Sequence, residues 1–177
     1  MTKLIYLTDS YRKTLSAKIV FLKQKGDCWQ VVLDQTIFYP QSGGQPADQG
    51  EIIGQKGKLI VNSVFMHDKN VIHEGKLTGT LHQGEQVTAA INWHNRFDNM
   101  RCHSAGHVVH EIIMQLIPGL IPLKADHGKH AYIEYQGVIN PKLKDTIEKR
   151  SNMLVAESKN ITTELVTLTE LKKRVSW

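Results

Sequence analysis

The spacing of apolar residues changes near Asn92, and this change constrains the fold more than any other feature of the sequence. Before it, short segments with the alternation and β-branched content of strands are separated by Gly, Asp and Asn turns. The segments are Lys3–Leu7, Ser16–Leu22, Trp29–Leu33, Lys58–Phe65, Val71–His73 and Gln86–Ile91. Closely spaced short strands are typical of a small barrel or sandwich. We therefore predict an N-terminal β-barrel domain over residues 1–92.

After Asn92 the pattern favours mixed helices and strands. A helix is expected from Trp93 to just before Pro118-Gly119, then a strand near Ala131–Tyr135. A second helix is expected to open at Asn140-Pro141, because Asn is a good N-cap and Pro suits the first helical turn. We expect another strand over Thr163–Leu168 and the start of a further helix before the chain stops. The prediction is an α+β fold with a second domain over residues 93–177.

Composition limits the classes of protein that this chain can belong to. The hydrophobic content of 41% and charged content of 22% over 177 residues are those of a globular protein, and no apolar run approaches the ~20 residues that cross a bilayer. The first ten residues do not resemble a signal peptide, so we expect a cytoplasmic protein. The net charge of +5 permits a polyanionic partner, but a solvated surface explains it equally well.

Two histidines, His103 and His107, are four residues apart in the first expected helix. Side chains at i and i+4 leave the same face of a helix, so both imidazoles can reach one metal ion. Ordinary amphipathic-helix histidines are the alternative. The sequence disfavours a metalloprotease, because Ser104 stands where His-Glu-x-x-His needs Glu.

A second motif is the loop Asp34–Gly50, which combines closely spaced glycines and prolines with polar residues. Glycines such as Gly43 and Gly44 can bring backbone amides against a ligand, although a tight turn explains them as well. Gly106 inside the helix costs about 1 kcal/mol relative to Ala, so we expect either a ligand or a packed strand to approach it closely.

Together the two motifs resemble the alanyl-tRNA editing proteins, freestanding relatives of the editing domain of alanyl-tRNA synthetase. The resemblance rests on Thr36-x-Phe-Tyr-Pro-x-Ser42-Gly43-Gly44-Gln45-Pro-x-Asp-x-Gly50 and on Arg96-Phe-Asp-x-Met-Arg-x-His103-Ser-Ala-Gly-His107. It covers essentially the whole chain. It implies a β-barrel followed by an α/β editing core, and an enzyme that hydrolyses seryl esters, and in a wider specificity glycyl esters, of tRNA(Ala).

The resemblance also implies site residues. His103 and His107 would ligate Zn²⁺, Thr36 and Gln45 would act on the substrate, and Ser42, Gly43 and Gly44 would contact it. A pocket that hydrogen-bonds the serine hydroxyl would reject alanine, because its polar groups would then be left unpaired.

The chain departs from the family in its zinc ligands. The family takes two further ligands from a later Cys-x-x-x-His, but here no cysteine follows Cys102 and no histidine follows His130. The core is therefore expected to be C-terminally incomplete and to bind zinc weakly or substoichiometrically. His127 and His130 could complete the site, or form a surface pair at a strand edge. The alternative to the enzyme is an inactive tRNA-binding remnant.

Overall fold

The computed structural model describes residues 1–162 and 164–174, and it groups them into two compact units that meet at residues 139 and 140. The first unit contains the barrel, the long helix and a β-hairpin. The second contains the remaining helices and is described by itself. The domain boundary predicted at Asn92 stays a prediction, although the change from strands to helix does fall there.

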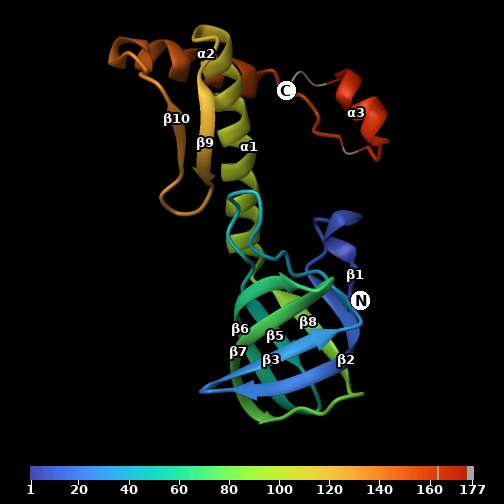
Figure 1. The fold of residues 1–177 in the computed structure, drawn as a ribbon. Helices are drawn as coiled ribbons and strands as arrows, with labels where there is room; N and C mark the ends of the chain where they lie inside the picture. Colours follow the sequence, from blue (N-terminus) through green and yellow to red (C-terminus); the bar gives the residue numbers. More distant parts are fainter. Residues whose placement is uncertain (163, 175–177) are drawn as a thin grey trace. The chain divides into compact units, whose positions relative to one another are not determined.

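A closed antiparallel barrel occupies the first part of the chain (Figure 1), which confirms the predicted fold class. Its strand order is β2-β3-β7-β6-β5-β8, with β8 returning to pair with β2. The barrel strands are β2 (Thr14–Lys25), β3 (Cys28–Leu33), β5 (Gly50–Ile53), β6 (Lys56–His67), β7 (Asn70–Thr80) and β8 (Gln86–Ile91). Two shorter strands, β1 (Lys3–Leu4) and β4 (Gln35–Thr36), pair in parallel outside it.

The core of the barrel is formed by inward-facing aliphatic side chains at alternate strand positions. Leu15, Ala17 and Ile19 illustrate this alternation along β2, each at most 4% exposed. The period of two follows from the pleat of a strand, which sends successive side chains to opposite faces. Further fully buried residues are Val31, Leu33, Ile52, Leu59, Val61, Val64 and Val71.

Two hairpin turns of the barrel contain the Gly, Asp and Asn residues expected between its strands, and their shape follows from local backbone chemistry. Gly26 joins β2 to β3 with φ of 58°, and Asp68 and Lys69 join β6 to β7 with φ of 44° and 63°. The two positive φ values at Asp68 and Lys69 match the right-handed twist of the strands that this two-residue loop connects.

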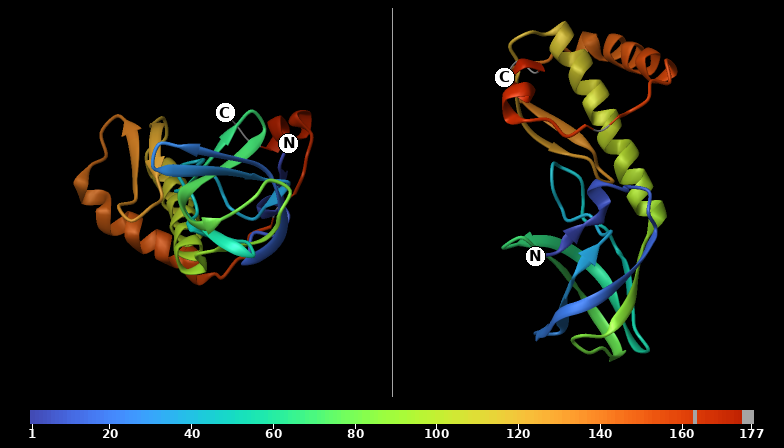
Figure 2. Two further views of the ribbon diagram at one scale, coloured as in Figure 1. Left: turned by 90° about the horizontal axis from the view of Figure 1, so that it is seen from below. Right: turned by 90° about the vertical axis from the view of Figure 1, so that its right-hand side faces the viewer.

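Helix α1 (Trp93–Leu116) begins directly after β8, and its bounds agree with those predicted from sequence. The side chain of Asn92 caps it by accepting a hydrogen bond from the amide of Asn95 at 3.2 Å. The hairpin of β9 (Ile121–Asp126) and β10 (Tyr132–Gln136) follows and contacts α1 through β10 (Figure 2). Tyr135 of β10 bonds and stacks with His110 of α1, with Oη 2.9 Å from Nδ1.

Several elements of the structure differ from those predicted from the sequence. Lys3–Leu7 is only briefly extended, because Ile5–Leu7 forms the 3-10 turn η1, and the strands β5 and β9 were not predicted. In the second unit, Asn140 caps the turn η2 (Pro141–Leu143), which leads into α2 (Lys144–Ala156), as expected. The strand predicted over Thr163–Leu168 is wrong for residues 164–168, because residues 164–167 belong to no strand and α3 (Leu168–Arg174) begins at Leu168. Thr163 lies outside the described residues.

None of the helices in the described part of the chain has the length and apolar character that a bilayer crossing requires.

Candidate functional site

The loop between β4 and β5 is folded so that its glycines face α1 and β9. Ser42 and Gln45 exchange two backbone hydrogen bonds across Gly43 and Gly44, at 3.2 and 2.9 Å. The two glycines have φ of 55° and 75°, which a side chain would disfavour. This tight turn presents the Gln45 side chain, only 5% exposed, to the helix.

Gln45 and His103 meet although 58 residues separate them in sequence. The Nδ1 of His103 lies 3.0 Å from the Oε1 of Gln45. A Cβ at Gly43 would be 3.7 Å from the Cε1 of His103, so the turn and the ring are in van der Waals reach. The two sequence motifs therefore form one site.

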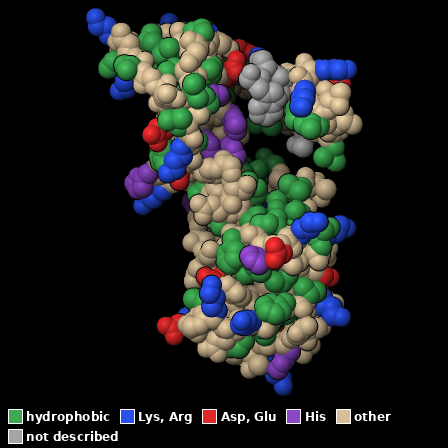
Figure 3. Space-filling model, in the orientation of Figure 1, with side chains coloured by type: hydrophobic (Ala, Val, Ile, Leu, Met, Phe, Trp, Pro, Cys, Tyr) green, Lys and Arg blue, Asp and Glu red, His purple; other side chains and the backbone are tan. Residues whose placement is uncertain are grey.

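A third imidazole, that of His127, completes a cluster with the predicted pair. Ring centroids are 5.0 Å apart for His103 and His107, 4.5 Å for His103 and His127, and 6.2 Å for His107 and His127. Histidine side chains gather along the α1 part of the face shown in Figure 3. We call His103, His107 and His127 the histidine cluster.

His127 is held between the glycine-containing turn and α1. Its amide donates to the carbonyl of Gly44 at 2.8 Å, and its ring lies against Gly106 of α1. A Cβ on Gly106 would stand 2.4 Å from the Cε1 of His127, and one on Gly44 would stand 2.9 Å from its Cδ2. Gly106 is therefore explained by packing of this imidazole, whereas His130 is exposed on the surface beyond it.

Burial favours the neutral form of two of these imidazoles. Desolvation is the main reason that the pKa of His103 lies below its usual value, and the neighbouring His127 and His107 lower it further. The pKa of His127 is lowered first by burial and then by His107, while Asp126 acts in the opposite direction. A neutral imidazole can accept a proton or ligate a metal.

The cluster has the donor chemistry of a zinc site without its arrangement. Imidazole nitrogen is a common zinc ligand, but the three rings are nearly parallel, with interplanar angles of 12° to 29°. Within residues 1–162 and 164–174, no group of three histidine, cysteine or acidic side chains converges as a metal requires. The rings as arranged therefore do not form a three-ligand site.

The turn is fixed to α1 by a buried ion pair that was not predicted from sequence. The carboxylate of Asp48 accepts from the guanidinium of Arg96, with Nε at 2.8 Å from Oδ1 and Nη2 also bonded to Oδ2. Arg96 donates in addition to the carbonyls of Ile37 and Ser10, and Asp48 accepts from the amide of Tyr39. Both charged side chains are at most 2% exposed, so the first turn of α1 is anchored to the loop.

Thr36, predicted to act on the substrate, forms its hydrogen bonds with His73 and Phe38 and not with the histidine cluster. Its side chain is fully buried, and Oγ1 lies 2.8 Å from the Nε2 of His73. The same oxygen accepts from the amide of Phe38 at 3.1 Å. Substrate contact by Thr36 stays a prediction.

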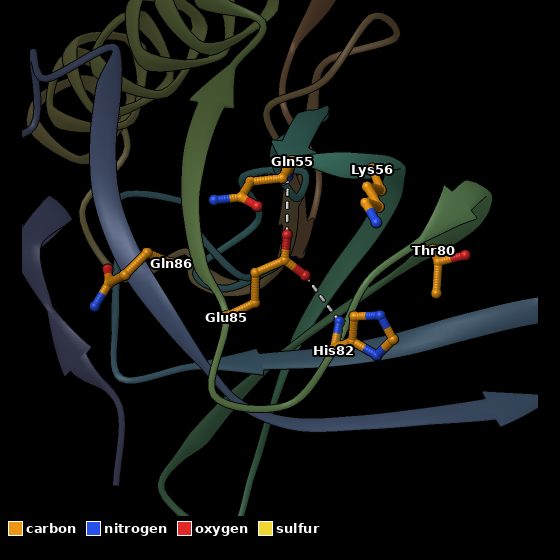
Figure 4. A pocket seen from close by; sticks show the side chains of 6 residues that line it. All are labelled: Gln55, Lys56, Thr80, His82, Glu85 and Gln86. Atoms are coloured by element: carbon orange, nitrogen blue, oxygen red, sulfur yellow. Dashed lines mark hydrogen bonds between the residues drawn. The ribbon is translucent and has the colours of Figure 1, made fainter.

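A separate hollow of about 450 Å³ lies at the other end of β8 from α1 (Figure 4). It is lined by Gln55, Lys56, Thr80, His82, Glu85 and Gln86. The carboxylate of Glu85 accepts from the amides of Gln55 and His82, both at 2.9 Å. These bonds lower the pKa of Glu85 and hold the turn before β8, so its carboxylate has a structural role.

The chain is similar to known proteins of tRNA aminoacylation and editing. Residues 10–95, which span the barrel and the start of α1, match the family model described as tRNA synthetases class II (A). The chain is 31% identical over 156 residues to the alanyl-tRNA editing protein AlaX-L of Pyrococcus horikoshii, covering 88% of this chain and 39% of that protein. It is 29% identical over 178 residues to the alanine–tRNA ligase of Pyrococcus abyssi, covering 98% of this chain and 19% of that one.

A further relative is similar over most of both chains. The alanyl-tRNA editing protein AlaX-M of Methanosarcina mazei is 30% identical over 192 residues, which is 99% of this chain and 72% of that protein. The chain belongs to the family of alanyl-tRNA editing proteins, as the two motifs predicted. It spans well under half the length of the AlaX-L and ligase relatives.

Proposed function

We propose that this chain hydrolyses the ester bond of seryl-tRNA(Ala), and in a wider specificity of glycyl-tRNA(Ala), as a trans-editing deacylase of the cytoplasm. The single observation that carries the proposal is the contact of Gln45 with His103, because it joins the glycine-containing turn to the histidine helix in one site. The relatives, which are alanyl-tRNA editing proteins and an alanine–tRNA ligase, support the substrate class.

Gln45 is the side chain best suited to tell serine from alanine. With its Oε1 toward His103, its amide N–H groups point to no partner within the described residues and can donate to a ligand. A serine hydroxyl can accept such a bond, whereas an alanine methyl would leave a donor unpaired at a cost of about 1–3 kcal/mol. Gly43 and Gly44 would let the substrate approach the turn, and Ser42 would border it.

The histidine cluster would supply the chemistry. A carbonyl oxygen can only accept, so the Nδ1 of His103 carries the proton in its bond to Gln45 and the Nε2 keeps its lone pair. We propose that His103 and His107 hold Zn²⁺ weakly. A zinc ion held by these two side chains would lower the pKa of a water molecule or polarise an ester carbonyl. Sub-stoichiometric metal in the purified chain, measured by elemental analysis, is the expected result.

The test is ester hydrolysis with matched substrates. The purified chain is incubated with tRNA(Ala) charged with serine, glycine or alanine, with and without added zinc, and loss of the labelled amino acid is followed. We expect faster loss of serine than of alanine, and a Gln45→Ala variant that loses this preference. His103→Ala should lower hydrolysis, while His67→Ala, an exposed histidine of the barrel, serves as the matched control.

The competing function is tRNA binding without hydrolysis. It is favoured by the parallel stacking of the three imidazoles, which does not place their nitrogens around one point. Retention of charged tRNA with no ester loss at any zinc concentration would establish it and refute the deacylase. Equal hydrolysis of serine and alanine esters would refute the selectivity assigned to Gln45.

A further inference from the structure

Aromatic side chains form a continuous stripe where the barrel meets the first turns of α1. Trp93 and Phe97 are one helical turn apart and stack with centroids 5.6 Å apart and planes at 28°. Tyr11, from the segment before β2, lies against Trp93 at 5.5 Å. We call Tyr11, Trp93 and Phe97 the aromatic stripe.

Two basic side chains accompany the stripe. The Nζ of Lys13 lies 5.0 Å from the centre of the Trp93 ring, and the Cζ of Arg101 lies 5.9 Å from that of Phe97. Lys13 and Arg101 are themselves exposed. Cations over ring faces add attraction at such distances, and here they also place positive charge along both ends of an aromatic surface.

Two rings of the aromatic stripe are exposed to solvent and are not part of the hydrophobic core. Tyr11 is 62% exposed and Phe97 37% exposed, whereas Trp93 is partly buried against the barrel core. Exposed clusters of large apolar side chains mark interaction sites more often than scattered single residues do. The stripe therefore has a rigid base, Trp93, and two accessible rings.

The chemistry of the stripe matches single-stranded nucleic acid. Bases stack on aromatic rings regardless of sequence, and neighbouring Lys and Arg side chains contact the phosphates. One acidic residue, Asp98, lies on the same stretch of helix, with a carboxylate oxygen 3.4 Å from the Nε2 of His94. Positive charge beside flat exposed rings is the complement of an unpaired RNA strand.

The position of the stripe sets the length of RNA that it can hold. Phe97 and His103 are six residues apart on α1, a rise of about 9 Å along the helix axis. The two residues also lie about 120° apart around the helix axis, and stacked bases are about 3.4 Å apart along a strand, so at least three unpaired nucleotides are needed to bridge the two places. We infer that the aromatic stripe stacks the unpaired nucleotides at the 3′ end of an RNA, and so directs its terminal residue to Gln45 and His103.

The inference rests on the proposed function only for the identity of the RNA. Binding can therefore be tested without hydrolysis, using an uncharged RNA hairpin with four unpaired 3′ nucleotides and the same hairpin with a blunt end. Fluorescence anisotropy measures the dissociation constants. We expect Phe97→Ala to weaken binding of the overhang hairpin about 5- to 150-fold, as for loss of one base stack, and to leave the blunt hairpin unchanged.

Three further variants separate stacking from folding. Phe97→Leu keeps apolar volume against Trp93 but has no ring face, so it should weaken binding, whereas Phe97→Tyr should restore it. Phe21→Ala removes a ring of the barrel strand β2 that is 44% exposed, and it should bind as the unmodified chain does. Arg101→Gln should reduce the slope of log affinity against log salt by about one ionic contact.

Several outcomes would overturn the inference. It fails if the unmodified chain binds overhang and blunt hairpins equally. It also fails if Phe97→Leu, like the control Phe21→Ala, binds the overhang with the same affinity as the unmodified chain. Overhang binding that depends on Phe97, in a chain that hydrolyses no ester, would retain the stripe and refute the deacylase. Hydrolysis with a KM that Phe97→Leu does not change would retain the deacylase and refute the stripe.

Discussion

The stability of the barrel should fall steeply between pH 6.5 and pH 4 because of one buried histidine. His73 is fully buried on β7, with Nδ1 3.0 Å from the carbonyl oxygen of Val31 and Nε2 2.8 Å from the hydroxyl of Thr36. The carbonyl accepts, so Nδ1 carries the proton and Nε2 accepts from Thr36. Protonation of Nε2 would bury a cation and break this bond.

The magnitude follows from the two pKa values. Burial lowers the pKa of His73 from the ordinary 6.5 to about 4, although the bond to Val31 acts slightly in the opposite direction. Above pH 6.5 the ring is neutral in both states and its contribution to stability is complete. As the pH falls below 6.5, the unfolded chain binds a proton first, and the loss continues until the folded ring protonates near pH 4. A difference of 2.5 pKa units corresponds to about 3 kcal/mol.

The assay is urea unfolding followed by circular dichroism at pH values from 4 to 8, on the unmodified chain and on His73→Gln. Glutamine does not titrate, so the unmodified chain should lose about 3 kcal/mol more than the variant between pH 6.5 and pH 4. His103 and His127, whose pKa values are also lowered, act in the same direction in both proteins and cancel in the difference.

A control variant and a direct measurement check the assignment. His67→Gln removes an exposed histidine, with a side chain 71% exposed, and its stability curve should run parallel to that of the unmodified chain. In nuclear magnetic resonance spectra, the ring nitrogens of His73 should keep the neutral, Nδ1-protonated pattern down to about pH 5. Parallel stability curves for the unmodified chain and His73→Gln, or titration of the His73 ring near pH 6.5, would refute the reasoning.

Two more substitutions test how the site is held together. Asp48→Asn leaves the guanidinium of Arg96 buried without its counter-charge, so urea unfolding should show a loss of about 3–5 kcal/mol in the free energy of unfolding. Glu51→Gln, in a partly exposed pair with Lys58, should cost less than about 1 kcal/mol. Equal losses in the two variants would contradict the role of burial. Gly106→Ala should be destabilising despite the higher helix propensity of alanine, about 1 kcal/mol in its favour, because the added Cβ would stand 2.4 Å from the ring of His127. A Gly106→Ala variant that is more stable, with unshifted His127 resonances, would show that this packing is absent.

Much of the fold could be predicted because its signals are local. The alternation of apolar residues in β2 and the turn residues at Gly26 and Asp68 depend on near neighbours in sequence. The bounds of α1 could be predicted for the same reason, from the change in apolar spacing after Asn92 and from Pro118 after its end. Strand β9, with Pro122 and exposed side chains, lacks the apolar alternation that such a prediction needs.

The sequence predicted some residues of the candidate site but not the contacts between them. The motifs containing Gln45 and His103 could be recognised, but not the hydrogen bond between them. His127 was an uncertain candidate, because a His-x-x-His spacing in a loop does not reveal that one ring is 5% exposed and the other lies on the surface. The mid-helix Gly106 was the one signal that a bulky group had to approach there.

The sequence by itself determined the barrel pattern, the helix that follows it and the membership of an editing family, because each depends on residue types at short, fixed spacings. Only the tertiary structure decided which side chains meet. It brought His127 against Gly106, paired Asp48 with Arg96 across 48 residues and placed the hydroxyl of Thr36 on His73. The reason is physical: contacts between distant segments are selected by packing and by the need of every buried polar group for a partner, and neither is written in local spacing.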